Sequence, residues 1–297
     1  MTEQSLPVLP PSGGGVRTLL RAALPSLPGA GLVPGVRKVS PDRFEPFGFR
    51  REAVRVDPAH VAAYAAVCRF PRKDTVPITY PHLLAFELHM AIMSDSRFPF
   101  PAIGTVHLEN TISQHRPVAV GETLDVATRV EAPRTHPKGT VVDFVTTVHS
   151  GGELVWESVS SYLRRGRGGE PSGGLTLDVV PAGTTTWRLG ADLGRRYGAV
   201  SGDVNPIHLT PLTAKALGFR RHIAHGMWTK AASLAAVENR LPGAVRVEVA
   251  FKTPVFLPAT VGFGVEAVGD QALPDLALAL TNPRTGAPHL VGRTHAL

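Results

Sequence analysis

The sequence predicts an α+β protein made of two tandem copies of one domain, each an antiparallel sheet with a long helix. Three observations predict it. In each half, a strand and helices precede a run of alternating apolar and polar segments, which is typical of antiparallel strands. A stretch rich in Gly and Arg, residues 165–174, separates the halves without any periodicity. When Pro117 is set on Pro254, apolar positions of the neighbouring strands coincide, and Tyr64 on Tyr197 aligns the preceding helices.

The first half begins its regular structure near residue 54 with a short alternating strand. Asp57 followed by Pro58 predicts a helix start, as N-cap and first-turn proline. This helix is expected to reach about residue 68, and a second, more apolar helix is expected over residues 82–93. Strands are then predicted at 105–114, 123–130, 141–149 and 154–163.

The second half repeats this order. A strand is predicted at residues 185–189, a helix at 190–197, a short helix at 210–217 and a long helix at 225–241. The short helix closes at Gly218, a typical C-terminal residue. The remaining strands are predicted at 245–253, 260–268, 276–281 and 289–296.

These elements predict the domain boundaries. Residues 1–40, rich in Pro and Gly, are expected to form a flexible arm with one apolar patch at Val16–Leu24. Residues 41–164 are expected to form the N-terminal domain, residues 165–174 a linker and residues 175–297 the C-terminal domain.

Composition limits the class of protein. The chain has 297 residues, of which 43% are hydrophobic, and a net charge of +7 from 31 basic and 24 acidic residues. No apolar run approaches the length of a membrane span, and no secretory signal is evident. The single cysteine, Cys68, excludes an internal disulfide and favours a cytoplasmic location. The basic residues form no aromatic-interleaved stripe, so nucleic-acid binding is not expected.

The most informative stretch is the run from Ser201 to His208. Gly202 and Pro206 bend the backbone at two places, so the run is neither a regular helix nor a strand. A bend at Asn205-Pro206 can turn the Asp203 carboxylate and the His208 imidazole toward one point, and we expect it to do so. Such a pair can hold a water molecule and move its proton, which is general acid–base chemistry.

A second informative run follows at residues 222–227. Gly226 opens an apolar segment, Met227–Val237, that suits a buried helix. The first N–H groups of a helix have no partner within it, and the positive end of the helix dipole lies behind them. The Gly226 N–H is therefore a candidate donor to an oxyanion.

Together, the run from Tyr197 to His208 and the His225-Gly226-Met227 run resemble the signature of the MaoC-like dehydratases. This family contains the (R)-specific enoyl-thioester hydratases and has the hotdog fold, so the resemblance implies two tandem hotdog domains. It implies a hydro-lyase that converts trans-2-enoyl thioesters to (3R)-hydroxyacyl thioesters in fatty-acid metabolism. The substrate is expected as a coenzyme A or acyl-carrier-protein thioester, and no metal or redox cofactor is expected. The chain is expected to be a pseudo-dimeric monomer or a homodimer.

The resemblance assigns roles to individual residues. Asp203 and His208 are expected to hold the water, Asn205 to orient them or bind the carbonyl side, and Gly226 to receive the thioester oxygen. A second set is expected to contact substrate: Tyr197, Ser201, His225, Phe70, Tyr80 and Phe86. The last three come from the first half and are candidates for an acyl tunnel, although packing in a core explains them equally well.

The first copy lacks the catalytic pattern. The alignment sets Phe70 on Asp203, Thr75 on His208 and Leu83 on Gly226, so this copy is expected to be inactive.

Three alternatives remain open on the sequence. His208, His222 and His225 with Asp203 suggest a metal site, but their spacing does not match the usual helical pattern. Ser201 is a possible nucleophile, although its surroundings lack the sharp turn that exposes such a serine. A hotdog thioesterase or a non-catalytic acyl-binding subunit is the rival to the hydratase.

Overall fold

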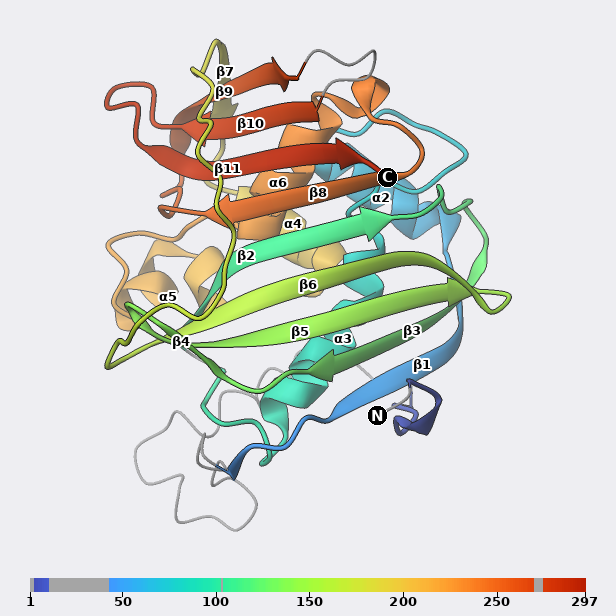
Figure 1. Cartoon of the computed structure of the whole chain (residues 1–297). Coiled ribbons are helices and arrows are strands. Elements are labelled where there is room, and N and C mark those ends of the chain that lie inside the picture. The colour runs from blue at the N-terminus through green and yellow to red at the C-terminus, as the bar shows by residue number, and fades with distance from the viewer. Residues whose placement is uncertain (1–2, 11–42, 103, 270–274) are drawn as a thin grey trace. The chain divides into compact units, whose positions relative to one another are not determined.

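The computed structural model describes residues 3–10, 43–102, 104–269 and 275–297 (Figure 1). The chain divides into two compact units, each assembled from three segments. The first unit comprises Met1–Arg55, Pro81–Leu108 and Thr123–Gly174. The second comprises Val56–Tyr80, Glu109–Glu122 and Leu175–Leu297. The last division falls at the end of the predicted linker, but two earlier segments of the second unit come from the predicted N-terminal domain. The predicted domain boundaries therefore stay a prediction.

The first unit is an antiparallel sheet with one helix packed on it. The strand order is β1-β3-β5-β6, and the short strand β4 pairs with β5. Helix α3 (Pro81–Ser94) contacts β1, β3 and β5, as a hotdog fold requires. The strands are β1 (Gly48–Arg55), β3 (Thr123–Val130), β4 (Arg134–His136), β5 (Gly139–Ser150) and β6 (Glu153–Arg165).

The N-terminal arm is not free along its whole length. A 3-10 helix, η1 (Glu3–Ser5), begins the described chain, and Val8 forms a bridge with Arg50 of β1. The Arg50 side chain also donates to the Leu6 carbonyl at 2.8 Å. Backbone hydrogen bonds between Arg50 and the residues Pro7 and Leu9 hold this part of the arm to β1, and the flexibility expected for residues 1–40 as a whole stays a prediction. The predicted patch at residues 16–24 lies outside the described residues.

The predicted linker is also held in place. The Gly166 and Gly169 N–H groups donate to the carbonyls of Lys138 and His136, and the Thr135 hydroxyl donates to the Glu170 carbonyl. This segment therefore runs beside β4 as part of the first unit.

The second unit has the same architecture with more helices. Its strands follow the order β7-β9-β10-β11-β8, and residues 109–114 of β2 (Thr105–Gln114) pair with β8. Helix α6 (Gly226–Ala235) contacts β10, while α2 (Pro58–Cys68) contacts α4 (Leu193–Ser201) and α6. The strands are β7 (Thr185–Leu189), β8 (Val245–Phe251), β9 (Ala259–Val268), β10 (Asp275–Thr281) and β11 (Pro288–Ala296).

Local sequence signals placed most element boundaries correctly. Asp57 caps α2 through its side chain, and Thr210 does the same for α5 (Pro211–Ala216). The predicted helix at 225–241 is too long, because α6 ends at Ala235 and a 3-10 helix, η6, covers Glu238–Arg240. Val237 beyond the helix is 3% exposed. Because buried apolar residues continue beyond Ala235, the apolar pattern of the sequence also continues there. The periodicity therefore cannot show where the helix ends.

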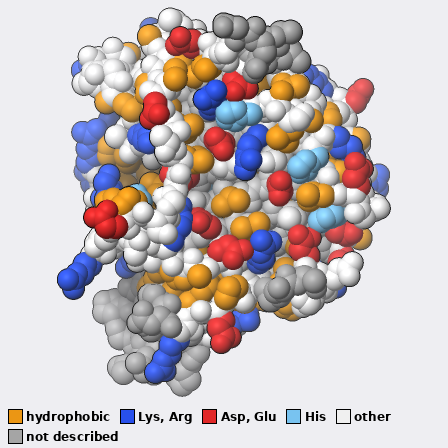
Figure 2. Space-filling model, in the orientation of Figure 1, with side chains coloured by type: hydrophobic (Ala, Val, Ile, Leu, Met, Phe, Trp, Pro, Cys, Tyr) orange, Lys and Arg blue, Asp and Glu red, His pale blue; other side chains and the backbone are white. Residues whose placement is uncertain are grey.

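The described residues bear on two expectations about the surface of the protein. Among the described residues, no helix is long and apolar enough to cross a membrane. On the face drawn in Figure 2, Lys and Arg side chains lie interspersed with Asp and Glu, and the described residues there form no continuous basic stripe. The expectation that the chain does not bind nucleic acid stays a prediction.

Candidate active site

The loop that carries the acid–base pair is bent at Gly202 and Pro206 and packs closely on Gly194 of α4. Gly202 ends α4 in the left-handed conformation, with φ of 75°, and its N–H donates to Gly198 O at 3.0 Å. A Cβ at Gly194 would lie 1.9 Å from the His208 carbonyl oxygen, so only glycine lets the loop pack this closely on α4. Pro206 then begins the 3-10 helix η5 (Pro206–His208).

His208 is held in one tautomer. Its side chain is buried, and Nδ1 lies 2.8 Å from the Ile223 carbonyl oxygen, which can only accept a hydrogen bond. Nδ1 therefore carries the proton and Nε2 keeps its lone pair. Burial lowers the pKa of His208; Asp203 and the Ile223 carbonyl raise it, and His222 lowers it further. The ring is neutral at neutral pH and is suited to act as a base.

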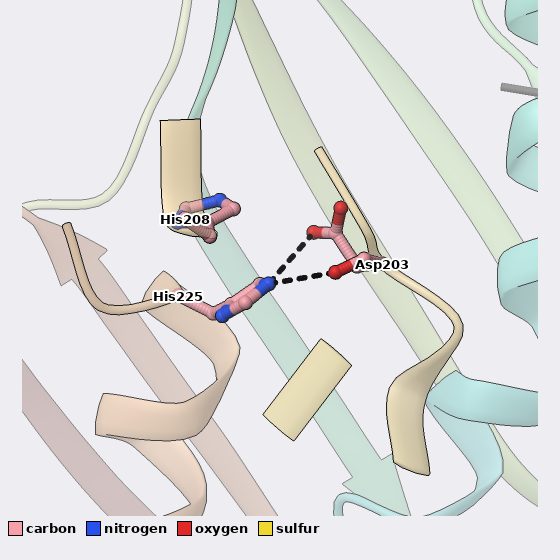
Figure 3. A group of neighbouring side chains, drawn as sticks. All are labelled: Asp203, His208 and His225. Atoms are coloured by element: carbon pink, nitrogen blue, oxygen red, sulfur yellow. Dashed lines mark hydrogen bonds and ion pairs between the residues drawn. The ribbon is translucent and has the colours of Figure 1, made fainter. Parts of the chain in front are cut away.

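Asp203 presents a partly exposed carboxylate beside this ring. Its side chain is 26% exposed, and Oδ1 accepts from the Asn205 N–H at 3.1 Å. Ligand atoms of Asp203, His208 and His225 all lie within 4.8 Å of one another (Figure 3). Two hydrogen bonds of about 2.8 Å through one water span such a gap. This separation is compatible with one water held between Asp203 and His208, and that shared water stays a prediction.

Asn205 and Ser201 shape the loop through their side chains. Asn205 caps η5, because its Oδ1 accepts from the Ile207 N–H at 3.3 Å. Ser201 Oγ accepts from the Asp203 N–H at 3.2 Å. Both contacts are consistent with the predicted orienting role of Asn205 and with a packing role for Ser201. Direct substrate contact by either residue stays a prediction.

His225 lies against His208. The two rings stack with centroids 3.7 Å apart and planes at 25°, and the Nε2–H of His225 donates to the Asp203 carbonyl at 2.9 Å. The Asp203 carboxylate oxygen Oδ2 lies 3.8 Å from the same nitrogen (Figure 3). Burial, with a further contribution from His208, lowers the pKa of His225 to about 3. His225 is therefore neutral over the physiological range.

Gly226 begins α6, as predicted. Its N-cap residue, His225, makes no side-chain capping bond, so that side chain does not occupy the first-turn N–H groups. The N-terminal end of a helix dipole carries partial positive charge there. A Cβ at Gly226 would lie 3.2 Å from the Phe251 ring, so the space over this position is narrow. The helix start can receive a developing negative charge.

Asp203, His208 and His225 also form a group whose ligand atoms could hold a metal ion. In this hydrogen-bonded arrangement His225 Nε2, which lies 3.8 Å from Asp203 Oδ2, carries the proton that it donates to the Asp203 carbonyl, so this nitrogen offers a metal no lone pair. His208 Nε2, His225 Nδ1 and the Asp203 carboxylate keep their lone pairs. The expected absence of a cofactor stays a prediction.

The predicted substrate-binding aromatics of the second unit form one packed cluster. Phe70, Tyr80 and Tyr197 surround Tyr64, with ring centroids 6.5, 5.7 and 6.2 Å from it. All four are buried, and Tyr197 in turn lies 4.8 Å from the His225 ring. Through Tyr197, this aromatic cluster packs against the His225 ring. Phe86 lies on α3 of the first unit and is partly exposed; the tunnel role of these residues stays a prediction.

Two features of this region were not predicted from the sequence: the acceptor that sets the His208 tautomer, and the burial of Lys230 in α6. The Ile223 carbonyl sets the His208 tautomer, and a backbone acceptor has no side-chain signature. Lys230 is fully buried and donates to Asn110 O at 3.0 Å, Asn110 Oδ1 at 2.5 Å and Val247 O at 3.2 Å. A lysine inside an otherwise apolar helix was the available signal for it.

Both copies begin a helix close to the aligned positions. Helix α3 begins at Pro81 and α6 at Gly226, so Leu83, which the alignment sets on Gly226, lies in the first turn of α3. The expected inactivity of the first copy stays a prediction.

Known proteins share both the fold and this motif region. A family model described as a MaoC like domain matches residues 176–282. The 3-hydroxyacyl-thioester dehydratase X of Mycobacterium tuberculosis is 42% identical over 287 residues, which cover 95% of this chain and 98% of that protein. The (R)-specific enoyl-CoA hydratase of Aeromonas caviae is 33% identical over 95 residues, 31% of this chain and 71% of that protein.

Solved structures agree. The crystal structure of HtdX of Mycobacterium tuberculosis matches with a TM-score of 0.74 at 41% identity, covering 85% of this chain and all (100%) of that chain. A MaoC-like dehydratase from Phytophthora capsici matches with a TM-score of 0.68 at 21% identity, covering 84% and 95% of the two chains, a likeness in fold. The predicted hotdog fold is confirmed, and the chain belongs to the MaoC-like dehydratase family.

Proposed function

We propose that the chain catalyses the reversible hydration of trans-2-enoyl thioesters to (3R)-hydroxyacyl thioesters. The observation that carries the proposal is the Asp203–His208 pair. Its polar atoms lie within 4.8 Å, and His208 has its lone pair on Nε2. The names of the two relatives describe the same class of reaction in those proteins. The (3R) configuration rests on the family resemblance.

In the hydration direction, Asp203 and His208 hold the water between them. His208 Nε2 takes one proton from the water while its oxygen bonds to C3 of the enoyl chain. The C2=C3 electron pair moves toward the thioester carbonyl, and the Gly226 N–H receives the negative charge on that oxygen. The enolate then takes a proton at C2 from the pair, so that H and OH have added across the double bond.

The chemistry needs neither a metal nor a redox cofactor, since proton transfer and one oxyanion donor suffice. The carrier is coenzyme A or an acyl carrier protein, because the net charge of +7 suits a phosphorylated or acidic partner. We place the reaction in the cytoplasm, where a buried single cysteine such as Cys68 stays reduced. The two-unit chain is expected as a monomer that replaces a dimer of single domains, or as a homodimer.

One assay tests the activity against its rivals. Crotonyl-CoA and a long-chain trans-2-enoyl-CoA are supplied separately, and loss of enoyl absorbance is followed together with release of free thiol. We expect absorbance loss without thiol release, and oxidation of the product only by a dehydrogenase specific for (3R)-hydroxyacyl-CoA. Thiol release would indicate a thioesterase instead. No turnover of either substrate would indicate a non-catalytic acyl-binding subunit.

A further inference from the structure

We propose that His225 is a positioning residue for the acid–base pair: its Nε2–H holds the Asp203 main chain, and its ring supports the face of His208. This inference rests on the proposed function. It replaces the substrate-contacting role that the sequence suggested for His225, because the described contacts of this ring are with the catalytic loop and the aromatic cluster.

The hydrogen bond to Asp203 fixes the carboxylate through the backbone. His225 Nε2–H donates to the Asp203 carbonyl at 2.9 Å, and Asp203 Oδ1 is tied to the Asn205 N–H at 3.1 Å. Main chain and side chain of Asp203 are then both restrained. Without the first restraint, the partly exposed loop is free to rotate the carboxylate away from the water.

The stacking of the His225 ring on His208 restrains the second member of the acid–base pair. The Ile223 carbonyl holds one edge of the His208 ring at 2.8 Å, and the His225 ring covers its face at 3.7 Å between centroids. Tyr197 packs against the His225 ring with centroids 4.8 Å apart, which restricts the movement of His225 away from His208. The direction of the His208 Nε2 lone pair is set by these contacts.

The charge state of His225 agrees with this role. The titratable groups that face it are His208 from η5, Asp203 from the loop and Tyr197 from α4, while His222 acts on His208. His225 Nδ1 is buried and has no hydrogen-bond partner, so a proton there would be a buried donor without an acceptor. Nδ1 is therefore unprotonated, and a neutral ring lies against the base without competing for its proton.

Three substitutions separate the donor from the ring. His225→Gln places an amide N–H near the original Nε2, whereas His225→Asn places it near Nδ1, out of reach of Asp203. His225→Phe keeps an aromatic ring and removes the donor. His289→Gln, at a partly exposed histidine on β11, is the control for changing any histidine. For each variant, kcat and KM with crotonyl-CoA and the melting temperature are measured.

We expect a split between kcat and KM. The Asn and Phe variants should lose about 10²-fold in kcat, the cost of a misplacement of about 1 Å, while KM changes little. The Gln variant should recover most of kcat even though its ring is gone, and the Phe variant should melt at or above the Gln variant. A role in folding alone predicts the opposite order, with activity following melting temperature. Phe or Asn variants that keep kcat near the wild-type value would overturn the proposal.

A second measurement does not depend on activity. Long-range 15N–1H spectra of the wild-type protein report the tautomer of each histidine. We expect His225 as the neutral Nε2–H form from pH 5 to pH 8, a range chosen because its pKa is lowered to about 3. A protonated His225 or an Nδ1–H form would overturn the proposal even if the variants fail to fold. If the wild type lacks hydratase activity but shows this tautomer, the proposed function fails and the contact with Asp203 stands.

Discussion

The Nδ1–H of His208 donates a 2.8 Å hydrogen bond to the carbonyl oxygen of Ile223. The N–H of Ile223 donates in turn to the carbonyl of Ile207 at 3.0 Å, so one residue holds both the backbone and the ring of the catalytic turn. Because the carbonyl can only accept, Nε2 of His208 is left as the proton acceptor. The tautomer of the base is thus decided by a residue fifteen positions away in the sequence.

Removing either member of the pair should abolish most hydration. Asp203→Asn keeps the shape and removes the negative charge, and His208→Ala removes the base. Each should lower kcat by about 10²–10⁴-fold, the range for a positioned acid or base. Melting temperatures should change little for Asp203→Asn, since its Oδ1 can still accept from Asn205. A variant that retains a tenth or more of wild-type kcat loses its assigned role.

The pH dependence of hydration should reflect the environment of His208. Its pKa is lowered by burial, so kcat/KM should be constant near pH 7–8 and fall only below the ordinary histidine value of about 6.5. Asp203 and His222 should shift the pH at which kcat/KM falls (the acid limb of the profile) in opposite directions. Asp203 raises the pKa, so Asp203→Asn should move the limb of the residual activity to lower pH; His222 lowers it, so His222→Gln should move it to higher pH. Shifts of the other sign would show that another group titrates.

Gly226→Ala should damage catalysis more than folding. The new Cβ would lie 3.2 Å from the Phe251 ring and would narrow the space in front of the helix start. The loss should approach about 3 kcal/mol of transition-state stabilisation, comparable to one oxyanion donor. Phe251 is partly exposed, so its ring can shift and preserve the fold.

The double variant Gly226→Ala, Phe251→Leu decides the cause of that loss. If crowding against Phe251 displaces the helix start, the smaller side chain should restore activity. If the Cβ itself blocks the thioester oxygen, activity stays low while the melting temperature recovers. Near wild-type turnover in the single variant would remove Gly226 from the oxyanion role.

Asn205 should tolerate a replacement that keeps its cap. Asn205→Ser retains a side-chain oxygen for the Ile207 N–H, whereas Asn205→Ala leaves that donor without a partner. If the role is to hold η5, the serine variant should stay within about tenfold of wild-type kcat and the alanine variant should lose more, with a stability cost of about 1 kcal/mol. Equal losses in both variants would show that the amide itself contacts substrate.

Lys230 should contribute to stability and not to catalysis. Its ammonium is fully buried and burial lowers its pKa, while three oxygens from Asn110 and Val247 satisfy its N–H donors. Lys230→Met should lower the free energy of unfolding by about 1–3 kcal/mol, because the three acceptor oxygens lose their donor. Lys230→Ala should lower it by about 2 kcal/mol more, because the shorter side chain leaves a cavity. Urea unfolding measures both.

A double variant tests the polar partner. Lys230→Met, Asn110→Leu removes both sides of the contact and should regain part of the loss, since an apolar pair leaves fewer unpaired groups. Additive losses would contradict the assigned contact. Hydration by the folded variants should be close to wild type; a large fall in kcat would place Lys230 in the catalytic machinery.

The sequence by itself determined what depends on neighbouring residues. The cap Asp57 marked a helix start, because a side-chain acceptor followed by proline satisfies the first turn locally. Alternation placed strands such as β3 and β7 on the predicted residues. The catalytic turn was equally readable, since Gly202 and Pro206 bend the chain wherever it lies in the fold.

Only the tertiary structure decided the contacts between distant segments. The pairing of His225 with Asp203, the Ile223 carbonyl behind His208 and the burial of Lys230 join residues separated by 15 to 120 positions. A residue's type says that it can donate or accept, but not which partner the packed chain brings within 3 Å.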